Sequence, residues 1–292
     1  MIRTLAVAIL LIHTSILSAQ SLSVHWEELT APDFVKAIQK SEGTCLLPMG
    51  VMEKHGPHLP IGNDLINARY LALHAAQQEY AVVFPEYFVS QILEARHQPG
   101  TVAYSPHLLF DFLQETTDEM GRNGCKKIVI VNGHGGNENF LPFFAQSQLQ
   151  SPHDYIVYIF TRLSHNDAPG RPAMKSAGRA PDMHAGETET SSTLVSRPDL
   201  VHPDRANEES GADQDREKLP GDLYTGIWWY ARFPNHYSGD GSVASKELGE
   251  FDMKTMTSDL VTAIKAVKAD SEGLKLQKQF YEEATHPLDT KQ

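Results

Sequence analysis

Short apolar segments without a regular polar position recur along the chain and alternate with segments of helical spacing. Residues 45–51, 81–85, 126–131 and 155–160 are such segments, and they are typical of strands buried on both faces. Strands of this kind lie parallel and are joined by right-handed crossovers through helices. We therefore predict an α/β fold, a three-layer α/β/α sandwich with a mostly parallel central sheet.

Several other segments place apolar residues three or four positions apart, which predicts amphipathic helices. These segments are residues 64–79, 107–122, about 138–148, 184–196 and 244–269. Residues 203–222 are polar and interrupted by Gly and Pro, so we expect a long loop there rather than a linker between domains. The polar residues 270–292 are expected at the periphery.

The first twenty residues have the character of a secretory signal peptide. Arg3 precedes an apolar run over residues 5–17, and the small residues Ser18 and Ala19 suit a cleavage site. A buried N-terminal helix is the alternative, whereas an anchoring helix fits less well because the run is short. We expect an exported protein, periplasmic or secreted, whose residues 21–292 form a single domain.

The charge balance excludes two classes of partner. The chain has 25 Lys and Arg against 37 Asp and Glu, which gives a net charge of −12 at pH 7. A negative surface repels nucleic-acid phosphates and anionic membrane surfaces. We therefore expect no nucleic-acid partner and no membrane association after signal cleavage.

The two cysteines, Cys45 and Cys125, both border apolar segments. Export would permit a disulfide between them. Cysteines beside core strands are nevertheless often buried free thiols, and this is the state that we expect.

Three segments concentrate histidines and carboxylates where strands are expected to end. They are residues 49–64, residues 131–139 and residues 182–191. Open α/β sheets bind ligands at the carboxyl ends of their strands. We expect the three segments to converge on one crevice.

Glu53, His55, Asp64 and His134 form a mixed carboxylate and imidazole set that suits Zn²⁺, Mn²⁺ or Fe²⁺. Glu53 and His55 are two positions apart, so they point the same way on an extended backbone. Asp64 has a carboxylate that is able to bridge two ions. Two ions about 4 Å apart can activate one hydroxide.

Each of these residue types also has a purely structural explanation. Asp64 is placed to cap the following helix, and Asn132 and Asn137 suit a turn. Glu187 and Glu189 occupy the first turns of a predicted helix, where acidic residues favour the helix dipole. We consider it the weaker interpretation that such structural roles alone account for all three segments. The chain also lacks the HExxH, GxSxG, Walker and GxGxxG motifs.

At these positions the sequence resembles the creatininase (creatinine amidohydrolase) family. The resemblance lies in PMGVMEKHGPHLP at residues 48–60, Asp64, NGH at residues 132–134 and HAGETETS at residues 184–191. HQPGT at residues 97–101 is similar to a further segment of the family. The matches cover about residues 45–192, and their combination is specific although each one alone is weak.

The resemblance implies a creatininase-like fold and a site with two divalent ions, Zn, Mn or Fe. Carried over by position, Glu53 and His134 would hold one ion, His55 would hold the other, and Asp64 would bridge them. His184 would transfer the proton. The resemblance also implies a small-molecule amide substrate and a homo-oligomer, with a hexamer as one form.

This sequence departs from the creatinine-hydrolysing type at Gly136, where that type has a metal-binding carboxylate. Glu189 is our preferred replacement ligand, with Glu187 as the alternative. Glu187 is also a candidate for orienting His184 during catalysis.

A second departure is Ala180–Pro181, where that type has a Trp-Asp pair. Trp228 and Trp229 are candidates for a replacement aromatic wall. We therefore do not expect creatinine itself to be the substrate. Gly135, Gly136 and Asn137 are predicted to border the substrate, because glycines allow its close approach.

The expected reaction is hydrolysis of a non-peptide C–N bond, in a cyclic amide, amidine or formamide, by a metal-bridging hydroxide. The alternatives are a metal-dependent peptide-trimming hydrolase and a non-catalytic periplasmic metal- or ligand-binding relative. We assign no role to His25, His74, His153 and His236, for which ordinary surface or core placement is expected.

Overall fold

The computed structural model describes residues 22–161, 168–176 and 180–290. The predicted signal peptide lies outside this part of the chain. Within the described residues, no helix is both long enough and apolar enough to cross a membrane.

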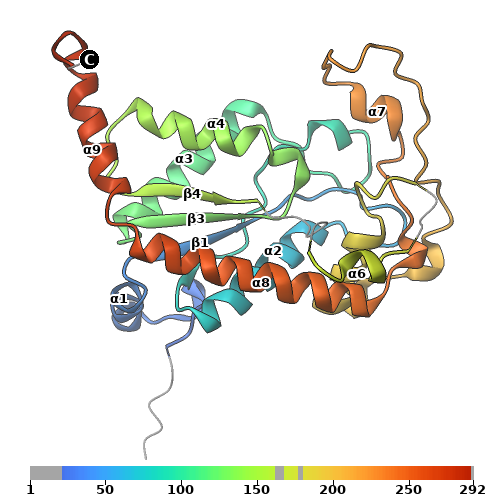
Figure 1. Cartoon of the computed structure of the whole chain (residues 1–292), viewed down its shortest axis with the longest axis horizontal. Coiled ribbons are helices and arrows are strands. Elements are labelled where there is room, and N and C mark those ends of the chain that lie inside the picture. The colour runs from blue at the N-terminus through green and yellow to red at the C-terminus, as the bar shows by residue number, and fades with distance from the viewer. Residues whose placement is uncertain (1–21, 162–167, 177–179, 291–292) are drawn as a thin grey trace, which may run out of the picture.

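The described strands form one parallel sheet in the order β2-β1-β3-β4 (Figure 1). They are β1 (Thr44–Met49), β2 (Val82–Val83), β3 (Lys127–Asn132) and β4 (Ile156–Phe160). In the β1–β3 pairing, Met49 lies beside Asn132, so the two central strands end level with each other. The predicted parallel sheet is confirmed. The edge strand β2 is shorter than residues 81–85, and Pro85 cannot donate to a strand ladder.

Alternate side chains of the central strands face two separate cores, as the period of a strand requires. Cys45, Leu47 and Ile130 face the helices α3 (Pro106–Arg122) and α4 (Phe140–Ser147). Leu46, Val129 and Val131 face α2 (Asn63–Gln78) and α8 (Lys246–Ala269), on the other side of the sheet (Figure 1). The predicted three-layer α/β/α sandwich is therefore confirmed.

Hydroxyl side chains begin three of the helices. Thr30, Ser105 and Ser245 each accept a hydrogen bond from the backbone N–H three positions on, at the start of α1 (Ala31–Lys40), α3 and α8. This is the preferred chemistry of an N-cap, because it satisfies a donor that has no partner inside the helix.

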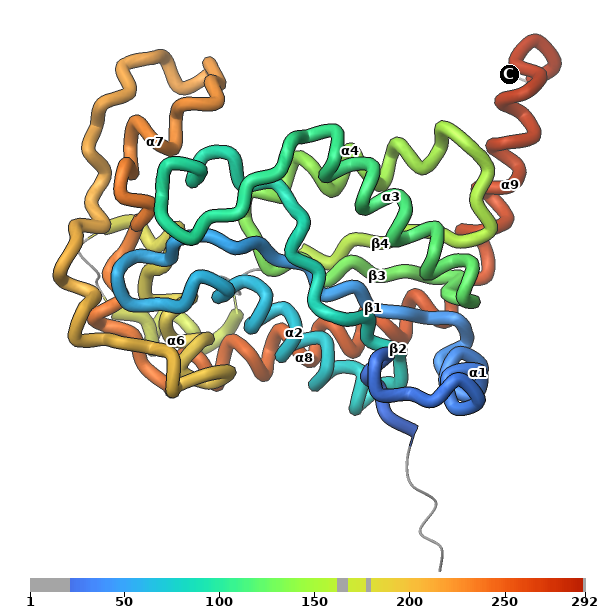
Figure 2. The backbone as a smooth tube through the Cα atoms, turned by 180° about the vertical axis from the view of Figure 1, so that it is seen from behind, coloured from blue at the N-terminus to red at the C-terminus, as the bar shows by residue number. Residues whose placement is uncertain are grey.

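The remaining elements are short or peripheral. The helices are α5 (Arg171–Met174), α6 (Glu187–Ser196), α7 (Trp228–Arg232) and α9 (Gly273–Ala284). The 3-10 helices are η1 (Trp26–Glu28), η2 (Leu93–Ala95), η3 (Gly135–Asn137), η4 (Gln148–Gln150), η5 (Pro198–Leu200), η6 (Pro203–Arg205), η7 (Gly241–Val243) and η8 (Pro287–Asp289). The expected long loop is found between α6 and α7, and Figure 2 shows it at the end of the molecule away from α9.

Cys45 and Cys125 form a disulfide, so the expectation of free thiols is wrong. Cys45 lies in β1 and Cys125 precedes β3, the strand next to it. Their Cα atoms are 5.7 Å apart and both side chains are fully buried. The pairing of the two strands brings together sulfur atoms that are 80 positions apart in the sequence.

Candidate metal centre

Two glycines allow the start of α2 to approach the ends of both central strands. A Cβ atom on Gly50 would lie 2.6 Å from the backbone nitrogen of Leu65, and one on Gly133 would lie 2.7 Å from the backbone oxygen of Asp64. Both distances are shorter than a side chain tolerates. The glycines after β1 and β3 therefore position Asp64, in the first turn of α2, beside the residues that follow the strands.

Four of the residues predicted as metal ligands, Glu53, His55, Asp64 and His134, lie together and are buried. Glu53 and His55 come from the segment after β1, and His134 follows β3. The Nδ1 atom of His134 lies 2.9 Å from Glu53 Oε1 and 3.0 Å from Asp64 Oδ2. The Nε2 atom of His55 lies 2.9 Å from Asp64 Oδ1. The structure thus places a carboxylate of α2 between two imidazoles from different strand ends.

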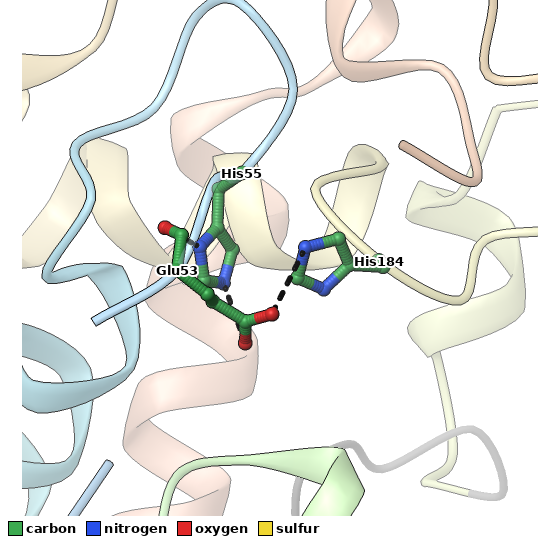
Figure 3. A group of neighbouring side chains, drawn as sticks. All are labelled: Glu53, His55 and His184. Atoms are coloured by element: carbon green, nitrogen blue, oxygen red, sulfur yellow. Dashed lines mark hydrogen bonds and ion pairs between the residues drawn. The ribbon is translucent and has the colours of Figure 1, made fainter. Parts of the chain in front are cut away.

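The potential ligand atoms fall into overlapping groups. Glu53, Asp64 and His134 form one group, and His55, Asp64 and Glu189 form another. Asp64 belongs to both groups, as a bridging ligand would. A further group consists of Glu53, His55 and His184, and Figure 3 shows both imidazoles of that group beside the Glu53 carboxylate.

The oxygen and nitrogen atoms of this cluster are suited to bind cations. Glu53 Oε1 and Asp64 Oδ2 are buried, and neither receives a hydrogen bond of acceptable geometry within the described residues. Buried carboxylate oxygens without a partner are costly unless a positive charge faces them. Mixed oxygen and nitrogen ligands suit Zn²⁺, Mn²⁺ and Fe²⁺. These two oxygens face His134 Nδ1 at 2.9 and 3.0 Å without a well-formed hydrogen bond, so the arrangement supports a metal centre at this place.

Backbone carbonyls fix the imidazoles in orientations that suit ligation. Nε2 of His134 donates to the carbonyl of Gln91 at 2.9 Å, and Nδ1 of His55 lies 3.3 Å from the carbonyl of Glu53. Each ring therefore keeps its other nitrogen for the carboxylate cluster. Such contacts to the far nitrogen commonly orient histidine ligands.

The pKa values show how strongly this cluster favours positive charge. Burial lowers the pKa of His55, but Asp64, Glu53 and Glu189 outweigh it and raise that pKa to about 10. Burial likewise opposes the charged form of His134, and the facing Glu53 and Asp64 carboxylates raise its pKa well above the ordinary value. Burial raises the pKa of Glu189 to about 7. In the protein without metal, protonated imidazoles balance the carboxylates.

His184 lies beside this cluster as a neutral imidazole. Burial, with the nearby His55 and His236, keeps its pKa well below the ordinary value. Its Nε2 lies 2.9 Å from the carbonyl of Lys54 and donates to it, which leaves Nδ1 with a free lone pair. The next residue, Ala185, has a φ of 55°, a strained value for a residue with a side chain. This strained turn holds His184 at the edge of the cluster.

His236 is a site residue for which the sequence analysis predicted no role. Its Nε2 donates to Glu53 Oε2, and the indole N–H of Trp229 donates to its Nδ1 at 2.7 Å. The tautomer is therefore fixed by a donor on one side and a carboxylate on the other. His236 belongs to no recognised motif and lies far from β1 in the sequence, so neither spacing nor pattern indicated it.

Other predicted residues are placed differently. Glu187 Oε1 accepts a hydrogen bond from the backbone N–H of Ser176, and no described ion pair joins Glu187 to His184. Asn137 is fully buried, and its amide donates to Asn132 Oδ1 at 2.9 Å. Asn137 thus supports the turn after β3 from behind, rather than facing a substrate.

A cavity of about 370 Å³ opens beside the cluster. Four residues of the cluster region are part of its lining: Glu53, His134, His184 and Glu189. The lining also includes Gly135, Gly136, Glu94, Trp228, Trp229 and Tyr224. The cavity is large enough for a small substrate and contains both tryptophans of the expected aromatic wall.

A buried carboxylate and imidazole cluster at the carboxyl end of a parallel sheet defines a candidate metal-dependent hydrolase of the α/β class. The sequence profile described as creatinine amidohydrolase matches residues 27–264. The chain is 25% identical over 271 residues to the creatinine amidohydrolase of Pseudomonas putida, covering 84% of this chain and 97% of that protein.

The mycofactocin precursor peptide peptidase of Mycobacterium ulcerans is 30% identical over 233 residues, covering 76% of this chain and 84% of that protein. A solved structure of a mutant creatininase of the Zn–Zn type has the same fold, with a TM-score of 0.71 and 22% identity, over 85% of this chain and 99% of that one.

The chain belongs to the creatininase family. The prediction of a creatininase-family amidohydrolase, a hydrolase that acts on C–N bonds other than peptide bonds, is confirmed at the level of the family. The relatives also include a peptidase, so the bond that this chain cleaves belongs to the proposal below.

Proposed function

We propose that this chain hydrolyses a non-peptide C–N bond, in a cyclic amide, amidine or formamide, at a centre of two divalent ions. The observation that carries the proposal is Asp64, whose two oxygens face imidazoles from different strand ends within two overlapping groups of ligand atoms. Glu53 and His134 would hold one ion, and His55 and Glu189 the other, with Asp64 shared. Bound ions of this kind supply hydroxide near neutral pH and polarise a carbonyl.

The protein's own groups position the reactants and move the proton. His184 donates to Lys54 through Nε2, so its Nδ1 is the atom that takes up a proton and delivers it to the leaving nitrogen. His236 holds Glu53 through Nε2. Gly135 and Gly136 expose backbone beside His134, which allows a planar amide to approach closely.

Creatinine is not the substrate that we propose. Gly136 provides no carboxylate, and a Cβ atom there would lie 2.4 Å from His134 Nε2. The second candidate is metal-dependent trimming of peptides, which the 30% identity to a peptide peptidase favours.

We also propose that the protein is exported. The Cys45–Cys125 disulfide supports this, because disulfides persist in oxidising compartments and are rare in the cytosol. The signal peptide proposed from the sequence supplies the route.

The test combines metal analysis with a substrate panel. We expect about two Zn, Mn or Fe ions per chain, and turnover of formamides or cyclic amides that stops when a chelator removes the ions. The variant His184→Ala should keep its metal and lose about 10²- to 10⁴-fold in kcat, the usual range for a lost general acid–base. His74→Ala, on the exposed face of α2, is the matched control.

Other results would reject the proposal in distinguishable ways. Turnover by the metal-free protein would exclude the proposed mechanism. Metal binding without turnover of amides, amidines or short peptides would indicate a binding protein instead. Turnover of peptides alone would establish the second candidate.

A further inference from the structure

An apolar groove adjoins the metal cavity. Exposed apolar side chains from three elements form its walls: Leu93 of η2, Phe143 of α4, and Ile227 and Tyr230 at α7. Phe143 is 63% exposed and Ile227 is 58% exposed. Figures 1 and 2 both show the segment that carries η2 lying between α4 and α7. Large apolar side chains gathered in this way usually mark a binding surface.

The groove and the metal cavity lie side by side and share part of their lining. Gln91, Glu94, Gly136, Asn139, Tyr224 and Gly226 line both. Gly136 belongs to both linings, and a Cβ atom there would lie 2.9 Å from Glu94 Oε1 as well as against His134. The absence of a side chain at this position, which removes the metal-binding carboxylate of the creatinine-hydrolysing type, therefore also leaves space where the cavity and the groove meet.

We propose that the groove binds an apolar arm of the substrate while the substrate's amide lies at the metal centre. The inference rests on the proposed function and names the substrate class: an amide or formamide that carries an aromatic or branched aliphatic group a few bonds from the scissile C–N bond. A molecule with the size of creatinine would fit entirely within the metal cavity and leave the groove exposed to water.

The lining that the groove shares with the cavity favours a substrate arm over a second copy of the chain as the occupant. Tyr224 and Gly226 line the cavity and the groove alike. A second copy seated on the groove would cover these two residues and close the cavity from this side. A substrate arm occupies the same surface only during the reaction, and the shared lining places it beside the reacting bond.

Matched probes with and without an arm test the proposal on the metal-loaded protein. The armed probes are N-(3-phenylpropyl)formamide and 4-phenylbutanamide, and their unarmed counterparts are N-methylformamide and acetamide. In each case water adds its oxygen to the carbonyl carbon, the C–N bond breaks, and the amine or ammonia leaves with a proton. We expect kcat/KM to be at least about tenfold higher for one armed probe than for its counterpart, since burying apolar groups in a fitted pocket commonly gives such ratios.

Variants of the groove walls locate the effect. Phe143→Ser and Ile227→Ser, on opposite walls, should each lower kcat/KM for the armed probe about tenfold through KM, and leave the unarmed probe within about twofold. Phe280→Ser, an exposed aromatic on α9 that lines neither space, is the control.

The outcomes separate the inference from the proposed function. Equal kcat/KM for armed and unarmed probes overturns the inference alone. Absence of turnover on these probes, while a cyclic amide or amidine is still hydrolysed, overturns the inference alone. Absence of turnover on the probes and on the whole substrate panel overturns the proposed function and the inference together. If light scattering shows that Phe143→Ser reduces the oligomeric size, and all probes lose activity equally, the groove is an interface between copies and the inference is wrong.

Discussion

The two ends of β1 are surrounded by different kinds of chemistry. At the amino end, Cys45 is joined to Cys125, and Lys127 of the neighbouring strand donates to the carbonyl of Lys268 at 2.7 Å. At the carboxyl end, the buried oxygens Glu53 Oε1 and Asp64 Oδ2 both face one imidazole, 2.9 and 3.0 Å from Nδ1 of His134. The amino end is thus held by a covalent crosslink and a backbone contact, whereas the carboxyl end gathers carboxylates that need positive charge, from protonated imidazoles or from metal ions.

This difference suggests that stability and chemistry are separated along the sheet. Parallel strands align their carboxyl ends, so ligands from several strands gather there at no cost to the pairing between the strands. Buried groups that lack partners destabilise a fold, and a metal that binds only the folded protein offsets that loss. Changes at the carboxyl end should therefore affect function first, and changes at the amino end should affect stability first.

The largest expected effect comes from Asp64→Asn at the carboxyl end. The change keeps the shape of the side chain but removes the charge that faces both His55 and His134. We expect at least one of the two ions to be lost and kcat/KM to fall by roughly a thousandfold or more, because several kcal/mol of transition-state stabilisation depend on the ions. Elemental analysis and steady-state kinetics measure the two quantities.

Asp118→Asn is the matched control, because Asp118 accepts from the hydroxyl of Tyr155 at 2.6 Å, away from the metal centre. It should retain both ions and its activity. Two ions per chain in Asp64→Asn would show that Asp64 is only a structural residue of α2.

The second-largest effect is expected from the disulfide at the amino end of β1. Removing the disulfide in Cys45→Ala/Cys125→Ala should lower the free energy of unfolding by roughly 4.5 kcal/mol, the chain-entropy value for a crosslink between residues 80 positions apart. Metal content and kcat/KM of the folded variant should stay at the wild-type values. Urea unfolding of the variant, and of the wild type with and without reductant, measures the change. Loss of metal at a urea concentration where the variant is still folded would show that the two ends are coupled.

Much of the fold and half of the site could be predicted because regular structure determines them. Once the apolar segments are assigned to parallel strands, the residues that follow those strands must meet, as Glu53, His55 and His134 do. The disulfide escaped prediction because it depends on the register between β1, which contains Cys45, and β3, which begins just after Cys125. Hydrophobic periodicity indicates that a strand exists but does not define its register with a neighbour.

The other half of the site comes from chain that has little regular structure. His184 and Ser238 are joined by backbone hydrogen bonds, and this contact brings His236 to the cluster. His236 itself has a φ of 56°, a conformation that no sequence pattern nearby indicates. Its position depends on tertiary contacts between segments some fifty residues apart, so it became visible only in the structure.

The smallest effect is expected from variants of His236 and of its hydrogen-bond partner Trp229. His236→Ala removes the donor to Glu53 Oε2, and we expect metal affinity to fall about 10- to 100-fold, as is usual when the partner of a metal ligand is lost. Trp229→Phe keeps His236 but removes the indole N–H that fixes its tautomer, so the loss should be only a few-fold. Competition with a chelator measures both affinities.

Trp228→Phe changes the adjacent tryptophan, which also lines the cavity, and should leave metal affinity unchanged. Equal losses in the two tryptophan variants would mean that the aromatic wall, and not the hydrogen bond to His236, holds Glu53 in place.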